Sequence, residues 1–307
     1  MMRKVLITGA GGFVGSALAE AEIAAGHTVL ATDMAFDAGT RTRLRAAQLI
    51  EGPLSEVLAQ MSDIAVDVVI HAAAITADPA RFGLTKAAHL SANVSLLLQA
   101  LDWARSHGAK RFVFLSSSGV FGVAKDLQAV DESTPATATD PYSAAKRAAE
   151  IMLTGAAEPG FQTIALRLGP VFGPYETPRP TRPTPSLVAR MTAAAHDKGE
   201  ILVATPDARR DWTYLPDIAR AMGLLLDHMG TVPPLLHLTS GCAMSDLELA
   251  QAIAAHMPGV GVRAVSDTPA HPPRPVMISS VPSAIDGFPW TPFSTALGMM
   301  NPTKAPA

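Results

Sequence analysis

Residues 4–15 read Lys-Val-Leu-Ile-Thr-Gly-Ala-Gly-Gly-Phe-Val-Gly, an apolar run that ends in closely spaced glycines. Residues 4–7 predict a buried strand, and the residues after Gly12 have the pattern of a helix. Glycines permit a tight turn and let backbone N–H groups approach a phosphate, while the start of a helix adds partial positive charge. The spacing of Gly9, Gly12 and Gly15 differs by one residue, in its first gap, from the common dinucleotide fingerprint. The stretch therefore predicts a strand–turn–helix that binds a pyrophosphate.

A second strand is predicted at residues 27–32, and it ends at Asp33, 18 residues beyond Gly15. An acidic side chain at this place accepts hydrogen bonds from an adenosine ribose and repels a 2′-phosphate. The alternative is a solvated loop acid. Three arginines at positions 41, 43 and 45 offer partners for a 2′-phosphate, but such a run is more commonly a solvated helix face. The pattern favours NAD over NADP.

Composition excludes several classes of protein. A net charge of −3 over 307 residues gives no basic excess for nucleic acid or acidic lipid. The single cysteine, Cys242, excludes an intramolecular disulfide, and no Cys/His pair has ligand spacing, so we expect no metal site. The first apolar run breaks at Thr8, too early for a signal peptide, and no run of transmembrane length follows. We expect a soluble, cytoplasmic protein without nucleic-acid or membrane partners.

Strand-like runs alternate with helical patterns through the first half of the chain. The runs are at residues 66–70, 111–115 and 163–167, and the helices are near residues 90–106 and 142–153. This alternation predicts an α/β fold with a doubly wound parallel sheet of Rossmann type. Residues 170–185 then contain six prolines, which predicts a loop or linker. We expect an NAD-binding domain over residues 1–168 and, over residues 169–307, a smaller substrate-binding cap with some segments returning to the main sheet.

Tyr142 and Lys146 lie four residues apart on a helix that Pro141 can begin, so their side chains share a face. A phenol has an ordinary pKa near 10, too high for a base at neutral pH. An ammonium about 4 Å away would lower that pKa by roughly three units at an effective dielectric near 20. Ser117 ends a predicted strand, at the edge where doubly wound sheets bind ligands. Tyr-x-x-x-Lys also occurs by chance in many helices, so the pair gains its weight from the phosphate turn and the strand-end serines.

Together these motifs resemble the extended short-chain dehydrogenase/reductase family, the NAD-dependent sugar epimerases and dehydratases. The resemblance extends from Lys4 to about Asp227 and weakens toward Thr295. It is carried by residues 9–15 with Asp33, and by residues 71–74, 93–94, 114–122, 141–146, 166–170 and 210–218.

The resemblance implies roles for single residues. Tyr142 is the implied general base, Lys146 its activator and a ligand of the nicotinamide ribose, and Ser117 the partner of the substrate oxygen, with Ser118 as its rival. The implied cofactor is NAD. Its implied binding residues are Gly9, Gly12, Phe13, Val14, Gly15, Asp33, Ala72, Ala73, Ala74, Asn93, Tyr142 and Lys146.

The same resemblance implies substrate ligands and a partner. Arg210 and Arg274 match arginines that hold a substrate diphosphate, and the alternative for Arg274 is a solvated tail residue. Arg179 and Arg182 are expected in a surface loop as solubilising residues, with contact to the substrate as the less favoured reading. The helices around residues 96–106 and 142–153 correspond to the pair that builds a four-helix homodimer interface.

Departures from the family pattern bear on the reaction. Pro53 replaces an aspartate that touches adenine, and Pro170 replaces an asparagine of the nucleotide-sugar enzymes. Residues 118–119 are Ser-Gly where dehydratases have an Asp-Glu acid pair, so dehydration is disfavoured. Residues 120–122 and the turn at 168–170 are similar to those of sugar-acid dehydrogenases in the same family.

We therefore expect an NAD-dependent oxidoreductase that oxidises a secondary alcohol of a small-molecule carbohydrate. A nucleotide-sugar epimerase with a transient keto intermediate is favoured, because Arg210 and Arg274 are both present. The alternative is an NAD-dependent dehydrogenase of a free sugar or sugar acid that releases NADH, which Pro170 favours. A non-catalytic NAD-binding regulator is a remote alternative, which the retained serine, tyrosine and lysine oppose.

Overall fold

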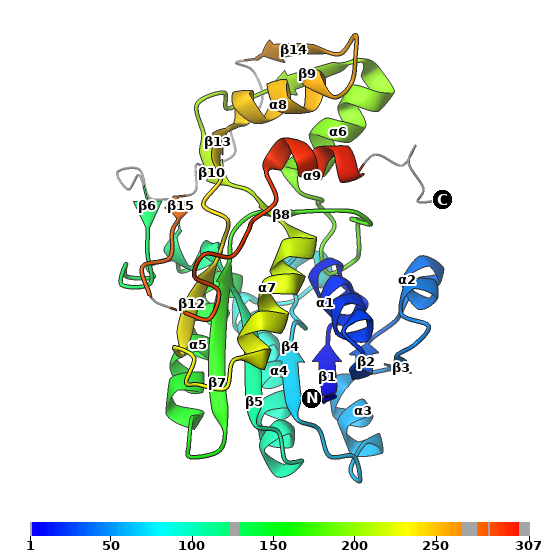
Figure 1. Cartoon of the computed structure of the whole chain (residues 1–307), viewed down its shortest axis with the longest axis vertical. Coiled ribbons are helices and arrows are strands. Elements are labelled where there is room, and N and C mark those ends of the chain that lie inside the picture. Colours follow the sequence, from blue (N-terminus) through cyan, green and yellow to red (C-terminus); the bar gives the residue numbers. More distant parts are fainter. Residues whose placement is uncertain (1, 123–128, 266–274, 282, 301–307) are drawn as a thin grey trace.

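The computed structural model describes residues 2–122, 129–265, 275–281 and 283–300, and its largest element is a parallel sheet of seven strands. The order across the sheet is β12-β7-β5-β4-β1-β2-β3 (Figure 1). The strands are β1 Lys4–Thr8, β2 Thr28–Asp33, β3 Gln48–Glu51, β4 Val68–His71, β5 Arg111–Ser117, β7 Gln162–Leu168 and β12 Leu235–Leu238. The strand order changes sides between β1 and β4: β2 and β3 follow β1 on one side, whereas β4 and the later strands lie on the other. Ligands of doubly wound sheets bind at this switch point. The predicted fold class is confirmed.

Helices cover both faces of the sheet. They are α1 Phe13–Ala24 and α7 Leu215–Asp227 on one face, and α3 Leu54–Gln60, α4 Lys86–Ser106 and α5 Pro141–Ala156 on the other. Successive strand residues point to opposite faces, so Leu6 packs in the core of α3, α4 and α5 while Ile7 packs in the core of α1 and α7. Both residues are fully buried.

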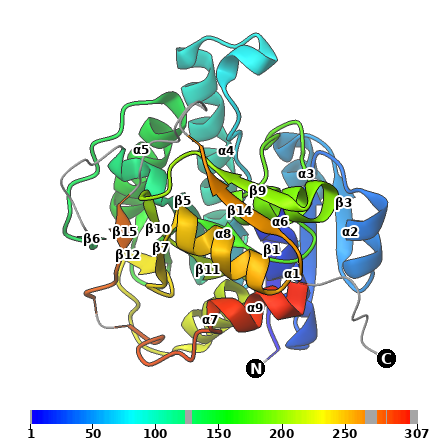
Figure 2. The same ribbon diagram turned by 90° about the horizontal axis from the view of Figure 1, so that it is seen from above.

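A smaller part of the molecule lies above the carboxyl ends of the strands (Figures 1 and 2). Its main elements are α6 Leu187–Lys198, β9 Glu200–Val203, α8 Asp246–Ala255, β14 Gly261–Ala264 and α9 Phe293–Met300. It has a hydrophobic core of its own, which includes Val188, Ile201, Leu249 and Phe293. The remaining elements are α2 Ala38–Arg43, η1 Pro79–Phe82, η2 Ser118–Phe121, β6 Ala129–Val130, β8 Val171–Phe172, β10 Arg209–Asp211, β11 Thr213–Tyr214, β13 Ala243–Ser245 and β15 Val276–Met277.

Two strands of the main sheet, β3 and β12, were not predicted from the sequence. β3 is a short edge strand with an exposed–intermediate burial pattern, so it has no continuous apolar run. β12 is the opposite edge strand and comes from the second half of the chain, as does α7, which packs beside α1. The division of the chain at residue 168 remains a prediction. In the described part of the chain, no helix is long and apolar enough to cross a membrane.

Candidate functional site

A cavity of about 810 Å³ lies between the strand ends and the smaller part of the molecule. Its lining includes the predicted site residues Gly9, Gly12, Phe13, Val14, Gly15, Ala72, Ala74, Ser117, Ser118, Tyr142, Lys146 and Arg210. A second cavity of about 150 Å³ contains Asp33 and Ala73 in its wall. Gly9, Gly12 and Thr181 line both cavities, so the two adjoin at the glycine turn.

The glycine turn is packed too closely for side chains. Gly9 has a φ of +71°, and a Cβ on it would lie 2.5 Å from the backbone nitrogen of Ala73. A Cβ on Gly15 would lie 2.2 Å from the carbonyl oxygen of Gly9. Gly12 is the N-cap of α1 and has no side chain with which to cap the helix. The N–H groups of the first helical turn therefore have no side-chain cap, and the residues of this turn line the cavity. This arrangement fits the phosphates of a dinucleotide.

Asp33 ends β2 beside this turn. Its carboxylate accepts hydrogen bonds from the backbone nitrogens of Gly11 at 2.9 Å and Met34 at 2.7 Å. Burial raises the pKa of Asp33, while these hydrogen bonds and the positive charge of Arg179 act to lower it. Asp33 is thus held in the wall of the smaller cavity, where it could recognise an adenosine ribose.

Asn93 lies outside the lining of both cavities. Its side-chain oxygen accepts from the backbone nitrogen of Ile75 at 2.9 Å, and its nitrogen donates to the carbonyl of the same residue at 3.2 Å. Asn93 therefore fixes the loop that follows β4, and that loop in turn lines the cofactor side of the cavity through Ala72 and Ala74.

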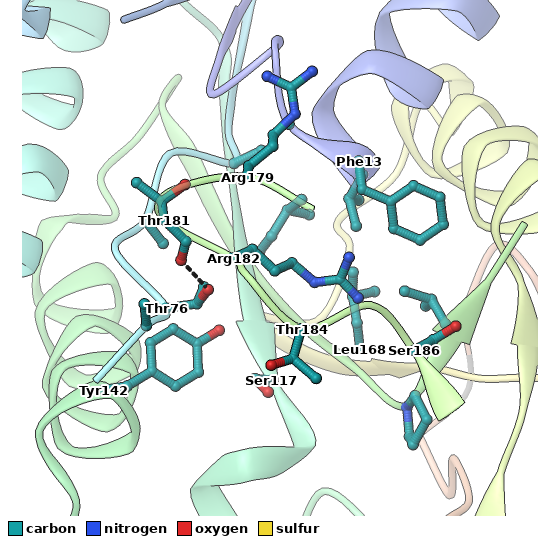
Figure 3. A pocket seen from close by; sticks show the side chains of 18 of the residues that line it. Phe13, Thr76, Ser117, Tyr142, Leu168, Arg179, Thr181, Arg182, Thr184 and Ser186 are labelled. Carbon is teal, nitrogen blue, oxygen red and sulfur yellow. Dashed lines mark hydrogen bonds between the residues drawn. The ribbon is translucent and has the colours of Figure 1, made fainter. Parts of the chain in front are cut away.

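Tyr142 and Lys146 stand in the first two turns of α5. The helix begins at Pro141, and the side chain of Asp140 caps it by accepting from the backbone nitrogen of Ser143 at 3.1 Å. The tyrosine hydroxyl points into the cavity in which Ser117 and Thr184 also lie (Figure 3).

Lys146 is buried and lies next to Tyr142. Its Nζ donates to the carbonyl of Leu115 at 2.6 Å and lies 5.6 Å from the centroid of the Tyr142 ring. Burial lowers the lysine pKa to about 7, and the negative charge of Glu150 opposes that shift. The Oγ of Ser117 accepts from the backbone nitrogen of Gly119 at 3.1 Å, which leaves its own proton for donation.

A buried polar network behind the site was not predicted from the sequence. Glu150 pairs with Arg167 through bonds of 2.9 and 2.8 Å and accepts from the Ser116 hydroxyl at 2.5 Å. Arg167 also reaches His237 at 3.4 Å. Glu150 lies one turn after Lys146, an i, i+4 spacing that is the only sequence signal for it.

Three of the four arginines considered as substrate ligands line the cavity. Arg210 lines the cavity, but its Nε and Nη2 are bound to the buried carboxylate of Asp246 at 3.0 and 3.4 Å. Arg274 lies outside the described residues. Arg179 and Arg182 were expected in a surface loop; the structure places them in a loop, and both also line the cavity, which was the less favoured reading. The prolines around them predicted a loop, and the segment is one: residues 175–186 form no regular helix or strand, and none of them is fully buried.

Cationic side chains outnumber carboxylates in the lining of the cavity, although Arg179, Arg182 and Arg210 each pair with a carboxylate outside it. Among the described residues, the lining holds the cations Arg81, Lys146, Arg179, Arg182, Arg190 and Arg210, and Asp78 as its one carboxylate. Such a wall suits anionic ligands. Within the described residues, no group of three or more His, Cys, Asp or Glu side chains is placed to hold a metal ion.

Comparison with protein families matches residues 5–235 to the NAD dependent epimerase/dehydratase family. The UDP-glucose 4-epimerase of Corynebacterium glutamicum is 30% identical over 73% of this chain and 71% of its own length. The dTDP-glucose 4,6-dehydratase of Streptomyces niveus is 27% identical over 87% of this chain and 82% of its own. The crystal structure of UDP-glucose 4-epimerase from Thermotoga maritima shares the fold, with a TM-score of 0.81, 23% identity and 97% of each chain covered.

Proposed function

This chain belongs to the NAD-dependent epimerase/dehydratase family of extended short-chain dehydrogenases/reductases, and we propose that it is a nucleotide-sugar epimerase that works through a transient keto intermediate. It is an NAD-dependent enzyme, as the family is. The observation that carries the proposal is that the Tyr142 hydroxyl and Ser117 lie in one cation-lined cavity (Figure 3), with the Nζ of Lys146 5.6 Å from the centroid of the Tyr142 ring.

In this proposal Tyr142 removes the proton of the substrate hydroxyl. Lys146 supports the phenolate by its charge, since an ammonium near a phenol favours the ionised form. Ser117 donates a hydrogen bond to the substrate oxygen, because its Oγ already accepts from Gly119. NAD, when bound, supplies the hydride acceptor. The glycine turn, Asp33 and the backbone of residues 72–74 would hold it.

The charge of the cavity supports a nucleotide sugar as substrate. A nucleoside diphosphate carries negative charge, and arginines bind phosphate oxygens through their planar fork. Arg190 of α6 and Arg210 of β10 line this cavity but not the smaller one that contains Asp33. The two curated relatives named above act on nucleotide sugars, as their names state. The Ser-Gly at residues 118–119 speaks against the dehydratase reaction.

A second candidate is an NAD-dependent dehydrogenase of a free sugar or sugar acid. It is favoured by Arg210, whose Nε and Nη2 are already bound to Asp246, so that less of its fork remains for a diphosphate. Pro170 lines the cavity and has no side-chain amide to offer a nucleotide sugar. A carboxylate is smaller than a diphosphate and needs fewer donors.

One experiment separates the two candidates. The purified protein is incubated with UDP-glucose, other nucleotide sugars and a panel of sugar acids, and both NADH absorbance and the sugar products are followed. An epimer formed without added NAD and without net NADH supports the epimerase. Steady NADH release with a sugar acid supports the dehydrogenase, and absence of both with every carbohydrate would revive the non-catalytic regulator.

We also propose a homodimer in which α4 and α5 of each copy meet. The two helices pack side by side in one chain (Figure 2). Their exposed faces carry large apolar side chains, namely Leu98, Ile151 and Met152, which are 47%, 75% and 37% exposed. Exposed apolar surface of this kind is typical of interaction sites.

A further inference from the structure

Residues 175–186, which we call the crossing segment, run over the cavity between β8 and α6. The segment contains no regular helix or strand, and its only bridge joins Arg179 to Arg182. Thr181 lines both cavities, whereas Thr184 and Ser186 line the larger one (Figure 3). The crossing segment therefore passes over the place where the two cavities adjoin.

Contacts with the Rossmann part hold the crossing segment down at several points. The carbonyl of Thr181 accepts from the Thr76 hydroxyl at 2.7 Å and from the backbone nitrogen of Ala77 at 2.9 Å. Arg179 forms an ion pair with Asp37. The segment can leave the cavity only if these contacts break.

Arg182 is fixed on the inner side of the crossing segment. Its Nη2 pairs at 2.6 Å with Glu176, whose side chain is 2% exposed and also accepts from the backbone nitrogen and hydroxyl of Ser186. The guanidinium lies over the ring of Phe13, 5.2 Å from its centroid. Its remaining terminal nitrogen, Nη1, is buried and has no hydrogen-bond partner among the residues that the structure describes.

A buried, charged N–H group without a partner is strongly unfavourable, so this nitrogen marks the place of a ligand acceptor. Phe13 is the first residue of α1, and the positive end of that helix faces the same place. Arg182 directly follows Thr181, which lines the junction of the two cavities. An anionic group would suit this junction, because the junction lies between Asp33 in the smaller cavity and Tyr142 in the larger one, as the diphosphate of a dinucleotide would.

We infer that Arg182 binds the diphosphate of bound NAD, so that the glycine turn and the crossing segment hold the cofactor together. The crossing segment then acts as a clasp, and NAD leaves only after the bonds to Thr76 and Ala77 open. This inference rests on the cofactor and is independent of the proposed reaction and substrate.

Binding measurements without turnover test the inference. Titration calorimetry on protein freed of dinucleotide compares ADP-ribose, which has the diphosphate, with adenosine, which lacks it. We expect Arg182→Met to lower the affinity for ADP-ribose by about 10- to 100-fold, because a charge-assisted hydrogen bond to the diphosphate is lost. The affinity for adenosine should stay unchanged. Arg182→Lys, which keeps the charge without the planar fork, should fall between.

Arg220 offers a matched control. It lies over the ring of Phe288 at 5.1 Å and pairs with the buried carboxylate of Asp217, as Arg182 does with Phe13 and Glu176, but it lies outside both cavities. Arg220→Met should leave ADP-ribose affinity unchanged. Equal weakening by both substitutions, or unchanged ADP-ribose affinity in Arg182→Met, would overturn the inference.

A second variant leaves Arg182 in place. Thr76→Val removes one bond that holds the crossing segment, and we expect NADH to dissociate several-fold faster in stopped-flow fluorescence. An unchanged dissociation rate would contradict the clasp even if Arg182→Met failed to fold.

Discussion

The ammonium of Lys146 donates a 2.6 Å hydrogen bond to the carbonyl of Leu115, and this contact joins α5 to the end of β5 inside the cavity. The hydrogen bond holds the Nζ of Lys146 in place near Tyr142. Its position comes from burial and from a backbone acceptor, neither of which the Tyr-x-x-x-Lys spacing reveals.

The burial of Lys146 predicts a pH-dependent stability. Its pKa is about 7 in the folded protein and 10.5 ordinarily, so between these values the unfolded chain binds more protons. The cost of burying the lysine is complete below about pH 7 and disappears above the ordinary pKa. Relative to Lys146→Met, the wild type should gain about 2–3 kcal/mol of unfolding free energy from pH 7 to pH 9. Urea titrations on protein freed of dinucleotide measure this, and a pH-independent difference would contradict it.

Replacement of the proposed base should stop turnover without unfolding the protein. Tyr142→Phe should lower kcat by about 100- to 10,000-fold, the usual contribution of a general base. Tyr175→Phe is the matched control, because Tyr175 is 64% exposed and its ring alone serves the contact with Arg43. If Tyr142→Phe kept wild-type turnover on the active substrate, another group would have to be the base.

The sequence predicted those parts of the site that depend on local pattern. Strand, glycine turn and helix follow one another within residues 4–24, and the spacing of Tyr142 and Lys146 fixes their common helix face. The prolines of the crossing segment predicted a loop, but they report only backbone restriction and could not indicate that Arg179 and Arg182 line the cavity. The pairing of Arg210 with Asp246 joins residues 36 positions apart through the fold of the smaller part, so no local pattern announces it.

The Glu150–Arg167 pair should be important for stability. Their side chains are 10% and 5% exposed, so removal of one partner leaves a buried charge without compensation. Glu150→Gln should lower the unfolding free energy by about 3–5 kcal/mol. Glu158→Gln is the control, because its pair with Arg105 is exposed and should contribute less than about 1 kcal/mol. Denaturant unfolding of both variants checks the contrast, and equal losses would refute it.

A charge on the exposed faces of α4 or α5 should weaken the proposed dimer. Leu98→Glu and Ile151→Glu place a carboxylate on these faces, and each should shift the protein toward the monomer in analytical ultracentrifugation. Leu224→Glu on α7 is matched, since Leu224 is 46% exposed and lies on a helix outside the proposed interface. A wild-type protein that sediments as a monomer at all concentrations would dismiss the dimer.

The discrimination against NADP should depend on Asp33. Its carboxylate lies in the wall of the smaller cavity and would repel a 2′-phosphate. The positive charge of Arg179 lies close enough to lower the pKa of Asp33. Asp33→Ser should therefore lower the affinity for NAD and raise the affinity for NADP, so that the ratio of the two affinities falls by at least about 10-fold. Asp37→Ser tests the effect of charge alone, because Asp37 pairs with the same arginine but does not line the smaller cavity. If the two variants change the preference equally, the ribose contact assigned to Asp33 is wrong, because the shift then reflects the net charge around Arg179.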